Sequence, residues 1–224
     1  MHLTKNKKKQ IEGIDFNKSY AVNEAIKLLK EKKFVKFDES VEVSINTGID
    51  SKQSDQNVRG SFVPPHGLGK KVDIAVFAQG KSAEEAKSLG VKKVGGEDLV
   101  LALQEKIDVD VIIATPDMMS VVSKIAKVLG PKGLMPNPKT GTVTNDVKST
   151  IQNINKGLVA YKNDKAGTIH AALGKISFDE NHLNENINSF IEEIKKIKPS
   201  GVKGNFINSV FISSTMGFGL KVEV

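Results

Sequence analysis

The chain has 224 residues, of which 39% are hydrophobic and 26% charged, the balance of an ordinary folded protein with one large or two small domains. It contains no cysteine, which excludes disulfides, thiolate metal sites and thiol nucleophiles. A formal net charge of +7 favours a polyanionic partner, nucleic acid before an anionic membrane, although a merely basic protein is the plain alternative. No stretch is apolar for long enough to span a bilayer.

The first segment is predicted to begin with an unstructured basic arm. Residues 1–10 carry four lysines and lack the apolar core of a secretion signal, so this arm is either solvated or in contact with phosphates. Asn23 is predicted to cap a helix that runs to about Lys33. Apolar and polar residues alternate over 41–47, which is typical of a strand with one solvent-exposed face in an antiparallel sheet. A short strand is expected near 62–63.

The pattern changes after the proline- and glycine-rich segment 64–71. Residues 72–78 and 109–115 are apolar on both faces, and helices are expected between and after them, which predicts a parallel sheet covered by helices on both sides. Ser82 and Glu85 form a predicted capping box. The other expected elements of this region are a strand at 91–94 and helices at 97–105, 117–127 and 147–155.

The last segment returns to half-exposed elements. It is predicted to contain a strand at 168–173, an amphipathic helix at 181–196 preceded by acidic residues that complement its dipole, and strands at 206–214 and 220–224. The nested order predicts two domains, one α/β and one α+β. Residues 1–66 and 161–224 are predicted to form a split α+β domain, and residues 67–160 an inserted, doubly wound α/β domain, with a hinge at the two linkers.

Residues 128–143 combine glycines, prolines and lysines without any acidic residue. Glycine and proline prevent regular structure there, so the sequence predicts a shaped, exposed loop that offers backbone groups and the side chains of Lys132 and Lys139 to a partner.

The sequence lacks the motifs of the catalytic and nucleotide-binding sites considered below. The phosphate-binding loop motif G-x-x-x-x-G-K-S/T does not occur. Gly67-Leu68-Gly69 precedes its strand, whereas the glycines of a dinucleotide-binding fingerprint follow the strand. Residues 138–144 are similar to the phosphorylation motif of ion pumps, but Pro138 stands where the aspartate is required. The four histidines lack metal-ligand spacing. No catalytic residue, cofactor or metal is therefore predicted. A nucleotide-binding α/β enzyme and a DNA-binding regulator are the alternatives to an RNA-binding protein.

Two short segments fit RNA binding. Phe37 beside Lys36 can cover a base or ribose while the lysine meets a phosphate, unless Phe37 belongs to the core. The turn Thr215-Met216-Gly217 offers a hydroxyl and a backbone without a side chain, or is only a connection between strands.

Several motifs in register resemble the L1 family of large-subunit ribosomal proteins in its bacterial form. They cover nearly the whole chain and comprise Lys36–Glu39, Ser54–Gly60, Pro65–Lys70, Ala114–Asp117, Leu129–Lys139, Asn163–Lys165 and Ser214–Gly217. The resemblance implies a split α+β domain with a Rossmann-like insertion, and a cytoplasmic, non-enzymatic protein of the ribosome.

The resemblance also implies the residues that contact RNA. Carried onto this sequence, they are Lys36, Phe37, Ser40, Ser209, Thr215, Met216 and Gly217, with Lys132 and Lys139 as secondary contacts from the inserted domain. The family often has threonine where Ser40 stands, and it usually has proline after Thr-Met-Gly, where this chain has Phe218-Gly219. The implied partners are large-subunit ribosomal RNA at the mobile stalk, exit-site tRNA, whose release the stalk assists, and the messenger RNA of the protein's own operon, which it represses. No membrane is implied.

Overall fold

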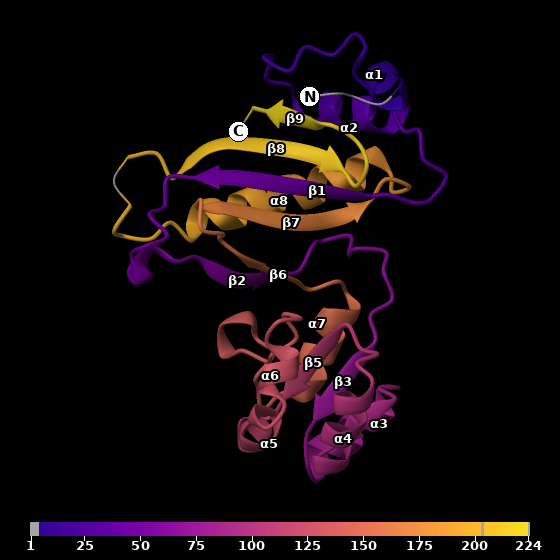
Figure 1. The fold of residues 1–224 in the computed structure, drawn as a ribbon, viewed down its shortest axis with the longest axis vertical. Helices are drawn as coiled ribbons and strands as arrows, with labels where there is room; N and C mark the ends of the chain where they lie inside the picture. Colours follow the sequence, from indigo (N-terminus) through magenta and orange to yellow (C-terminus); the bar gives the residue numbers. More distant parts are fainter. Residues whose placement is uncertain (1–4, 203, 224) are drawn as a thin grey trace. The chain divides into compact units, whose positions relative to one another are not determined.

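The computed structural model describes residues 5–202 and 204–223. The chain forms two compact units, which are described separately below. The first unit contains the segment up to Gly69 and the segment from Val159 onward, and the second is Lys70–Leu158. Figure 1 shows the elements of each unit.

The first unit is built on a four-stranded antiparallel sheet in which β1, the earliest strand, lies in the interior (Figure 1). The strand order is β7-β1-β8-β9, with bounds β7 (Thr168–Lys175), β1 (Ser40–Thr47), β8 (Ile207–Ser214) and β9 (Gly219–Val222). The prediction of an antiparallel sheet is confirmed. The sheet joins chain segments that lie far apart in the sequence.

Each face of this sheet has its own chemistry. Val41, Val43 and Ile45 of β1 are at most 1% exposed and belong to the core that also contains α2 (Val22–Glu31) and α8 (Glu180–Lys196). The opposite side, called here the open face, carries mostly polar side chains because successive residues of a strand point to opposite faces. Its members are Ser40, Glu42, Ser44, Asn46, Thr168, His170, Ala172, Lys175, Ser209, Phe211, Ser213, Gly219 and Lys221.

The helix ends of this unit differ in how well the sequence predicts them. Asp179 caps α8 by accepting the N–H of Glu180, in agreement with the acidic start that was predicted. Asn23 does not cap α2: the capping residue is Ala21, without a side-chain bond, and Asn23 lies inside the first turn. The prediction at Asn23 is wrong because the helix begins at Val22.

A short helix, a 3-10 turn and a two-stranded ribbon complete the described part of the first unit. Lys5–Ile11 is a helix, α1, so the unstructured arm is wrong for this part, and residues 1–4 lie outside the described chain. The short 3-10 turn η1 (Ser54–Gln56) precedes β2 (Arg59–Phe62), which pairs antiparallel with β6 (Val159–Lys162). The last strand ends at Val222, earlier than predicted, and Val224 is also outside the described residues.

The second unit contains a three-stranded parallel sheet of order β4-β3-β5. One side, with Phe77 and Ile112, packs against α4, the turn η2, α5 and α6, and the other, with Val76 and Ile113, packs against α3 and α7. The predicted parallel sheet with two covered faces is therefore confirmed. The bounds are β3 (Ile74–Phe77), α3 (Lys81–Ser88), β4 (Lys93–Gly95), α4 (Glu97–Glu105), β5 (Val111–Ala114), η2 (Pro116–Met118), α5 (Met119–Ser123), α6 (Ala126–Leu129) and α7 (Val147–Asn155).

Two local predictions for this unit are wrong. Helix α3 starts directly after Gly80, without a side-chain cap, so Ser82 already lies inside its first turn and forms no capping box. The single helix predicted over 117–127 is divided into η2, α5 and α6. At the break the N–H of Ile125 bonds to the carbonyl of Val122, the tighter i to i−3 pattern, and this ends α5.

The glycine- and proline-rich loop is folded back onto β5. It contains a 3-10 turn, η3 (Pro138–Thr140), capped by Asn137. The N–H of Ala114 bonds to the carbonyl of Thr142 at 3.0 Å, and Val143 forms a parallel bridge with Ala114. The loop is thus shaped as predicted, but part of it completes the sheet edge instead of facing a partner.

Candidate nucleic-acid interface

The predicted segments at opposite ends of the sequence meet at one junction. The backbone N–H of Ser40 donates to Thr215 Oγ1 at 3.0 Å, and the N–H of Thr215 donates to the carbonyl of Ser40 at 3.2 Å. This reciprocal pair fixes the start of β1 against the turn between β8 and β9. The segment from Lys36 to Ser40 is consequently next to Thr215-Met216-Gly217.

A buried carboxylate lies beneath this junction. Glu39 is 1% exposed, and its Oε1 accepts hydrogen bonds from the N–H of Met216 at 2.9 Å and from Ser214 Oγ at 3.3 Å. Its carbonyl oxygen accepts the N–H of Ile176. Glu39 therefore connects β1 to both the turn and the end of β7. Sequence reasoning gave this residue no role, and a glutamate among polar neighbours carries no signal of burial.

The turn itself is tightly packed. A Cβ atom at Gly217 would lie closer than 3.0 Å to Ser214 Oγ, so the turn leaves no room for a side chain there. Phe218, at the position where the resemblance implies proline, is 7% exposed and makes an edge-to-face contact with Phe16, with ring centroids 6.3 Å apart. Phe218 thus anchors the end of the turn in the core.

Above the junction the side chains face solvent. Phe37 is 50% exposed and Met216 is 48% exposed, so Phe37 is not the core residue of the alternative interpretation. Lys36 is exposed, with no ion pair or hydrogen bond to any other described residue. Two large apolar side chains and a cation are therefore exposed at the edge of a rigid junction. Contiguous exposed apolar surface, rather than single apolar side chains, is a common mark of a binding site.

Ser209, the remaining candidate of the first unit, lies at the far end of the open face. It pairs with Asn46, whereas Ser40 lies at the junction. The stretch of β1 from Ser40 to Asn46 spans about 20 Å at about 3.4 Å per residue. The seven predicted residues thus occupy both ends of one face, and a single ligand that touches all of them must cross the sheet.

Between these two ends, the open face carries residues that were not predicted from the sequence. Phe211 pairs with Ser44 in the middle of the open face and is 39% exposed. Lys175 donates from Nζ to Ser40 Oγ at 2.9 Å, which adds a cation beside the junction. The alternation of β8 could have revealed Phe211, because it shares the exposed phase of the strand with Ser209.

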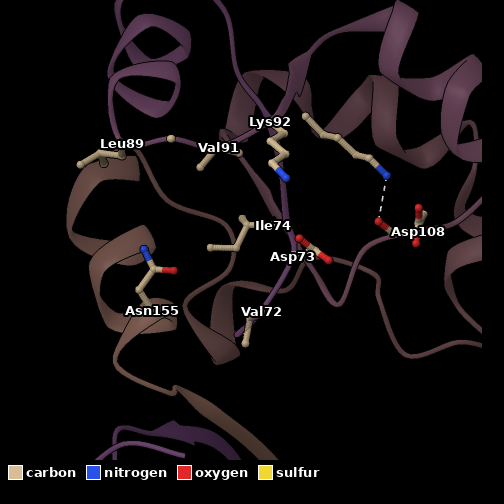
Figure 2. Close-up of a pocket in the computed structure, with 10 residues that line it drawn as sticks. Val72, Asp73, Ile74, Leu89, Val91, Lys92, Asp108 and Asn155 are labelled. Atoms are coloured by element: carbon tan, nitrogen blue, oxygen red, sulfur yellow. Dashed lines mark hydrogen bonds between the residues drawn. The ribbon is translucent and has the colours of Figure 1, made fainter. Parts of the chain in front are cut away.

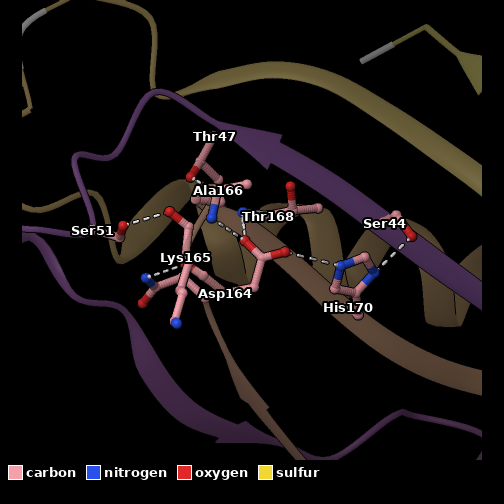
Figure 3. A network of polar contacts seen from close by, with 10 residues as sticks. Ser44, Thr47, Ser51, Asp164, Lys165, Ala166, Thr168 and His170 are labelled. Atoms are coloured by element: carbon pink, nitrogen blue, oxygen red, sulfur yellow. Dashed lines mark hydrogen bonds and ion pairs between the residues drawn. The ribbon is translucent and has the colours of Figure 1, made fainter.

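A polar network stiffens the same face (Figure 3). Ser44 Oγ lies 3.0 Å from His170 Nδ1, and His170 Nε2 lies 3.7 Å from Asp164 Oδ2. The backbone N–H of Thr168, together with that of Ala166, holds the pKa of the Asp164 carboxyl below its usual value. Asp164 is therefore a fixed anion at the edge of the sheet.

These three side chains do not form a hydrolytic triad. In that triad the serine faces Nε2 and the aspartate faces Nδ1, whereas Ser44 and Asp164 use the opposite nitrogens of His170. All three are also open to solvent, so the charge that a serine nucleophile develops would not be sheltered from water. The network is better suited to orienting polar groups toward a ligand on the sheet.

The secondary candidates belong to the second unit. Lys132 and Lys139 are both exposed on the loop after α6, and the backbone N–H of Lys139 bonds to the Asn137 side chain. The turn that Asn137 caps holds Lys139 outward. Lys132 follows Pro131 in the hydrogen-bonded turn that ends at Gly133.

The same unit has a cavity of about 260 Å³, shown in Figure 2. Apolar Val72, Ile74 and Val91 line it together with Lys92 and Asp73, and Lys93 Nζ donates to the carbonyl of Asp108 at 2.8 Å. These residues precede or begin the strands β3, β4 and β5. Doubly wound sheets bind nucleotides at the carboxyl ends of their strands, which is the opposite edge. The cavity does not support the nucleotide-binding alternative.

Among residues 5–202 and 204–223, no three histidine, aspartate or glutamate side chains gather as metal ligands would. None of the helices in the described part of the chain has the length and apolar character that a membrane crossing requires.

Comparison with known proteins identifies the family. A model of the ribosomal protein L1p/L10e family matches residues 28–218. Three similar proteins are each named large ribosomal subunit protein uL1. The protein of Thermosipho africanus (strain TCF52B) is 53% identical over 212 residues, covering 94% of this chain and 91% of the relative. Those of Ruthia magnifica subsp. Calyptogena magnifica and Coxiella burnetii (strain Dugway 5J108-111) are 50% identical, covering 99% of this chain and 96% of each relative.

The match runs from α2 through the turn after β8 and so includes both sides of the junction. Together with the near full-length relatives, it shows that this chain belongs to the ribosomal protein L1p/L10e family, in its bacterial form, a family of structural and non-enzymatic proteins of the ribosome.

Proposed function

We propose that the protein is a structural component of the large ribosomal subunit in the cytoplasm and that it binds ribosomal RNA through the junction and the open face of its first unit. The observation that carries the proposal is the reciprocal hydrogen-bonded pair between Ser40 and Thr215. It brings exposed Phe37 and Met216 to the edge of a sheet whose open face is lined by hydroxyls. RNA-binding proteins combine such surfaces because bases stack on apolar groups and ribose hydroxyls bond to polar ones.

The proposed contacts divide by chemistry. Phe37 and Met216 cover a base or ribose at the junction, while Lys36 and Lys175 face phosphates. The backbone of Gly217 allows close approach because no side chain intervenes. Along the open face, the hydroxyls of Ser44, Ser213 and Ser209 meet the sugar edge, with Phe211 between them as a second apolar platform. Thr215 acts mainly by shaping the junction, since its Oγ1 already accepts the N–H of Ser40.

Binding to an RNA fragment from the stalk region of the large subunit tests the proposal. We expect affinity to fall steeply with salt concentration. Lys36→Ala should reduce the slope of log affinity against log salt concentration by about one. Met216→Asp is expected to weaken binding strongly because it adds a charge that repels phosphates. Duplex DNA of equal length is expected to compete poorly. Unchanged affinity in both variants, or equal competition by DNA, would contradict the assignment.

Phe211 tests whether the RNA crosses the sheet. Phe211→Ala is expected to weaken binding by about 1–3 kcal/mol, the usual value for one stacked base. Leu101→Ala in the second unit is a matched control, because Leu101 is also an exposed apolar side chain, at 64%. If Phe211→Ala binds like the unaltered protein, the RNA is confined to the junction and Ser209 is not a contact.

The second unit is proposed to be an inserted domain that adds a weaker contact through Lys132 and Lys139, with the split domain as the main RNA-binding part. In the full chain, Lys132→Ala combined with Lys139→Ala is expected to reduce affinity less than Lys36→Ala. A larger loss from the double variant would make the loop the primary site.

We propose two further roles on the basis of family membership. In the ribosome the protein is proposed to form the mobile stalk and to assist release of deacylated tRNA from the exit site. Unassembled protein is proposed to repress its own operon through a messenger RNA site that imitates the ribosomal one. Ribosomes lacking the protein should release exit-site tRNA more slowly. A reporter fused to the operon leader should be repressed by the protein and not by the Met216→Asp variant.

A further inference from the structure

We infer that Glu39 is a positioning residue for RNA binding: its buried carboxylate sets the conformation of the turn that presents Met216 and Gly217. The inference rests on the proposed function, since it assigns a cause to the shape of the same site. Glu39 touches no ligand itself, because it is 1% exposed.

The hydrogen bonds of Glu39 are unusually one-sided. Oε1 accepts both the N–H of Met216 at 2.9 Å and the hydroxyl of Ser214 at 3.3 Å. Oε2 is fully buried and has no partner among the described residues. Burial of a carboxylate is unfavourable unless it is hydrogen-bonded. A carboxylate that keeps one unpaired oxygen in the core is a poor choice for stability alone, and an apolar side chain would fill the space at less cost.

The acceptor at Oε1 orients two groups of the turn. It directs the N–H of Met216 inward, which leaves the Met216 side chain outward and 48% exposed. It also fixes the hydroxyl of Ser214, which occupies the space where a side chain at residue 217 would be. The shape of the turn is therefore determined by successive contacts, from Glu39 to Ser214 and from Ser214 to Gly217.

The backbone of the same residue holds the other side of the junction. The carbonyl of Glu39 accepts the N–H of Ile176 at 2.9 Å, and the next residue, Ser40, makes the reciprocal pair with Thr215. The carboxylate is thus attached to a rigid strand end. A fixed acceptor of this kind holds a binding turn in its bound shape before the ligand arrives, which reduces the ordering cost of binding.

The experiment compares Glu39→Leu with Glu39→Gln in the full chain. Glutamine retains an acceptor oxygen for Met216 and Ser214, and its amide takes the place of the unpaired Oε2. We expect RNA affinity within about twofold of the unaltered protein for Glu39→Gln and a loss of about tenfold or more for Glu39→Leu. Ser214→Ala, a milder change that retains the bond to Met216, is expected to give an intermediate loss.

A measurement without RNA separates positioning from general destabilisation. The amide hydrogen of Met216 is expected to exchange slowly in the unaltered protein and in Glu39→Gln, and rapidly in Glu39→Leu. Ile45→Val is the matched control: it lowers the melting temperature from a buried site on β1, the strand that follows Glu39, and both Met216 exchange and RNA affinity should stay unchanged.

The outcomes distinguish the two proposals. If the unaltered protein does not bind the RNA, the proposed function fails, and the exchange of Met216 still tests the role of Glu39. If the protein binds RNA and Glu39→Leu binds equally well, or if the Met216 amide exchanges equally fast in all variants, the inference about Glu39 is overturned. A loss in Glu39→Gln as large as that in Glu39→Leu also overturns it, because the charge would then matter rather than the acceptor.

Discussion

Replacing Gly217 with alanine tests how tightly the turn between β8 and β9 is packed. A Cβ at this position would come closer than 3.0 Å to Ser214 Oγ, a distance that real Cβ atoms essentially never show. The Ser214 hydroxyl can move only by giving up its hydrogen bond to Glu39 Oε1. The backbone conformation adds no penalty, because Gly217 does not have a positive φ.

The size of the effect follows from the bond that is lost. A hydrogen bond to a charged group contributes about 1.5–3 kcal/mol, so Gly217→Ala is expected to lower the free energy of unfolding by that amount. In a Ser214→Ala background the new Cβ meets the Cβ and N of residue 214 at 3.4 and 3.6 Å, which are ordinary contacts. The same substitution should then cost almost nothing. The two changes are therefore coupled by about 1.5–3 kcal/mol.

Urea unfolding followed by circular dichroism measures this cycle, with RNA affinity as a second readout. Gly219→Ala, at the first residue of β9, is the matched control, because a Cβ there meets nothing within 4 Å, and it should leave stability nearly unchanged. The reasoning is refuted if Gly217→Ala is equally destabilising with and without the Ser214 hydroxyl, or if Gly219→Ala is as harmful.

Three further predictions concern other parts of the first unit. Phe37→Ala is expected to weaken RNA binding by about 1–3 kcal/mol with little change in the melting temperature, whereas Phe34→Ala, also exposed at 43%, should not affect binding; equal effects would contradict the assignment. Burial raises the pKa of Tyr161 to about 12, so the folded protein disfavours the Tyr161 phenolate. The contribution of the protonated phenol to the free energy of unfolding is complete below about pH 10 and is lost as the pH rises to about 12. Tyr161→Phe should abolish this decline, as measured by urea unfolding at a series of pH values. Asn186 is 0% exposed; its Nδ2 donates to the carbonyls of Leu173 and Gly67, and its Oδ1 accepts the N–H of His66. Asn186→Ala should lower the free energy of unfolding by at least about 1–3 kcal/mol, and a neutral result would contradict these bonds.

Periodic features of the sequence predicted the fold well. The alternation over β1 identified a strand with one buried face, and Val41, Val43 and Ile45 are buried as it requires. The continuous apolar runs at β3 and β5 identified a parallel sheet. Such patterns report which face of an element is buried, and burial dominates the energy of folding.

Helix ends were predicted less well, because capping depends on where the preceding chain turns. Asn23 and Ser82 are good capping residues, yet each helix begins one position before them, at Val22 and Lys81. The helix predicted over 117–127 breaks although its apolar spacing is helical, since the N–H of Ile125 bonds to the residue three positions back instead of four.

The candidate site was predicted through resemblance more than through chemistry. Exposure of Phe37 could not be inferred from its neighbours, and a core position at the entry to a strand fitted the local sequence better than an exposed one. Glu39 could not be recognised at all, because its burial is created by the turn at Thr215, which lies far away in the chain. Long-range pairing of this kind leaves no local pattern in a single sequence.

The interior position of β1 has a consequence for synthesis on the ribosome. Ser40 and Thr215 are separated by 175 residues, so at about 5–20 residues per second roughly 10–35 s pass before the second follows the first. β7 begins at Thr168 and β8 at Ile207, so β1 has neither neighbouring strand until the whole second unit, which ends at Leu158, has been synthesised. The junction between Ser40 and Thr215 therefore cannot form in a nascent chain until the final strands have been synthesised. Partly made protein cannot bind RNA through this junction.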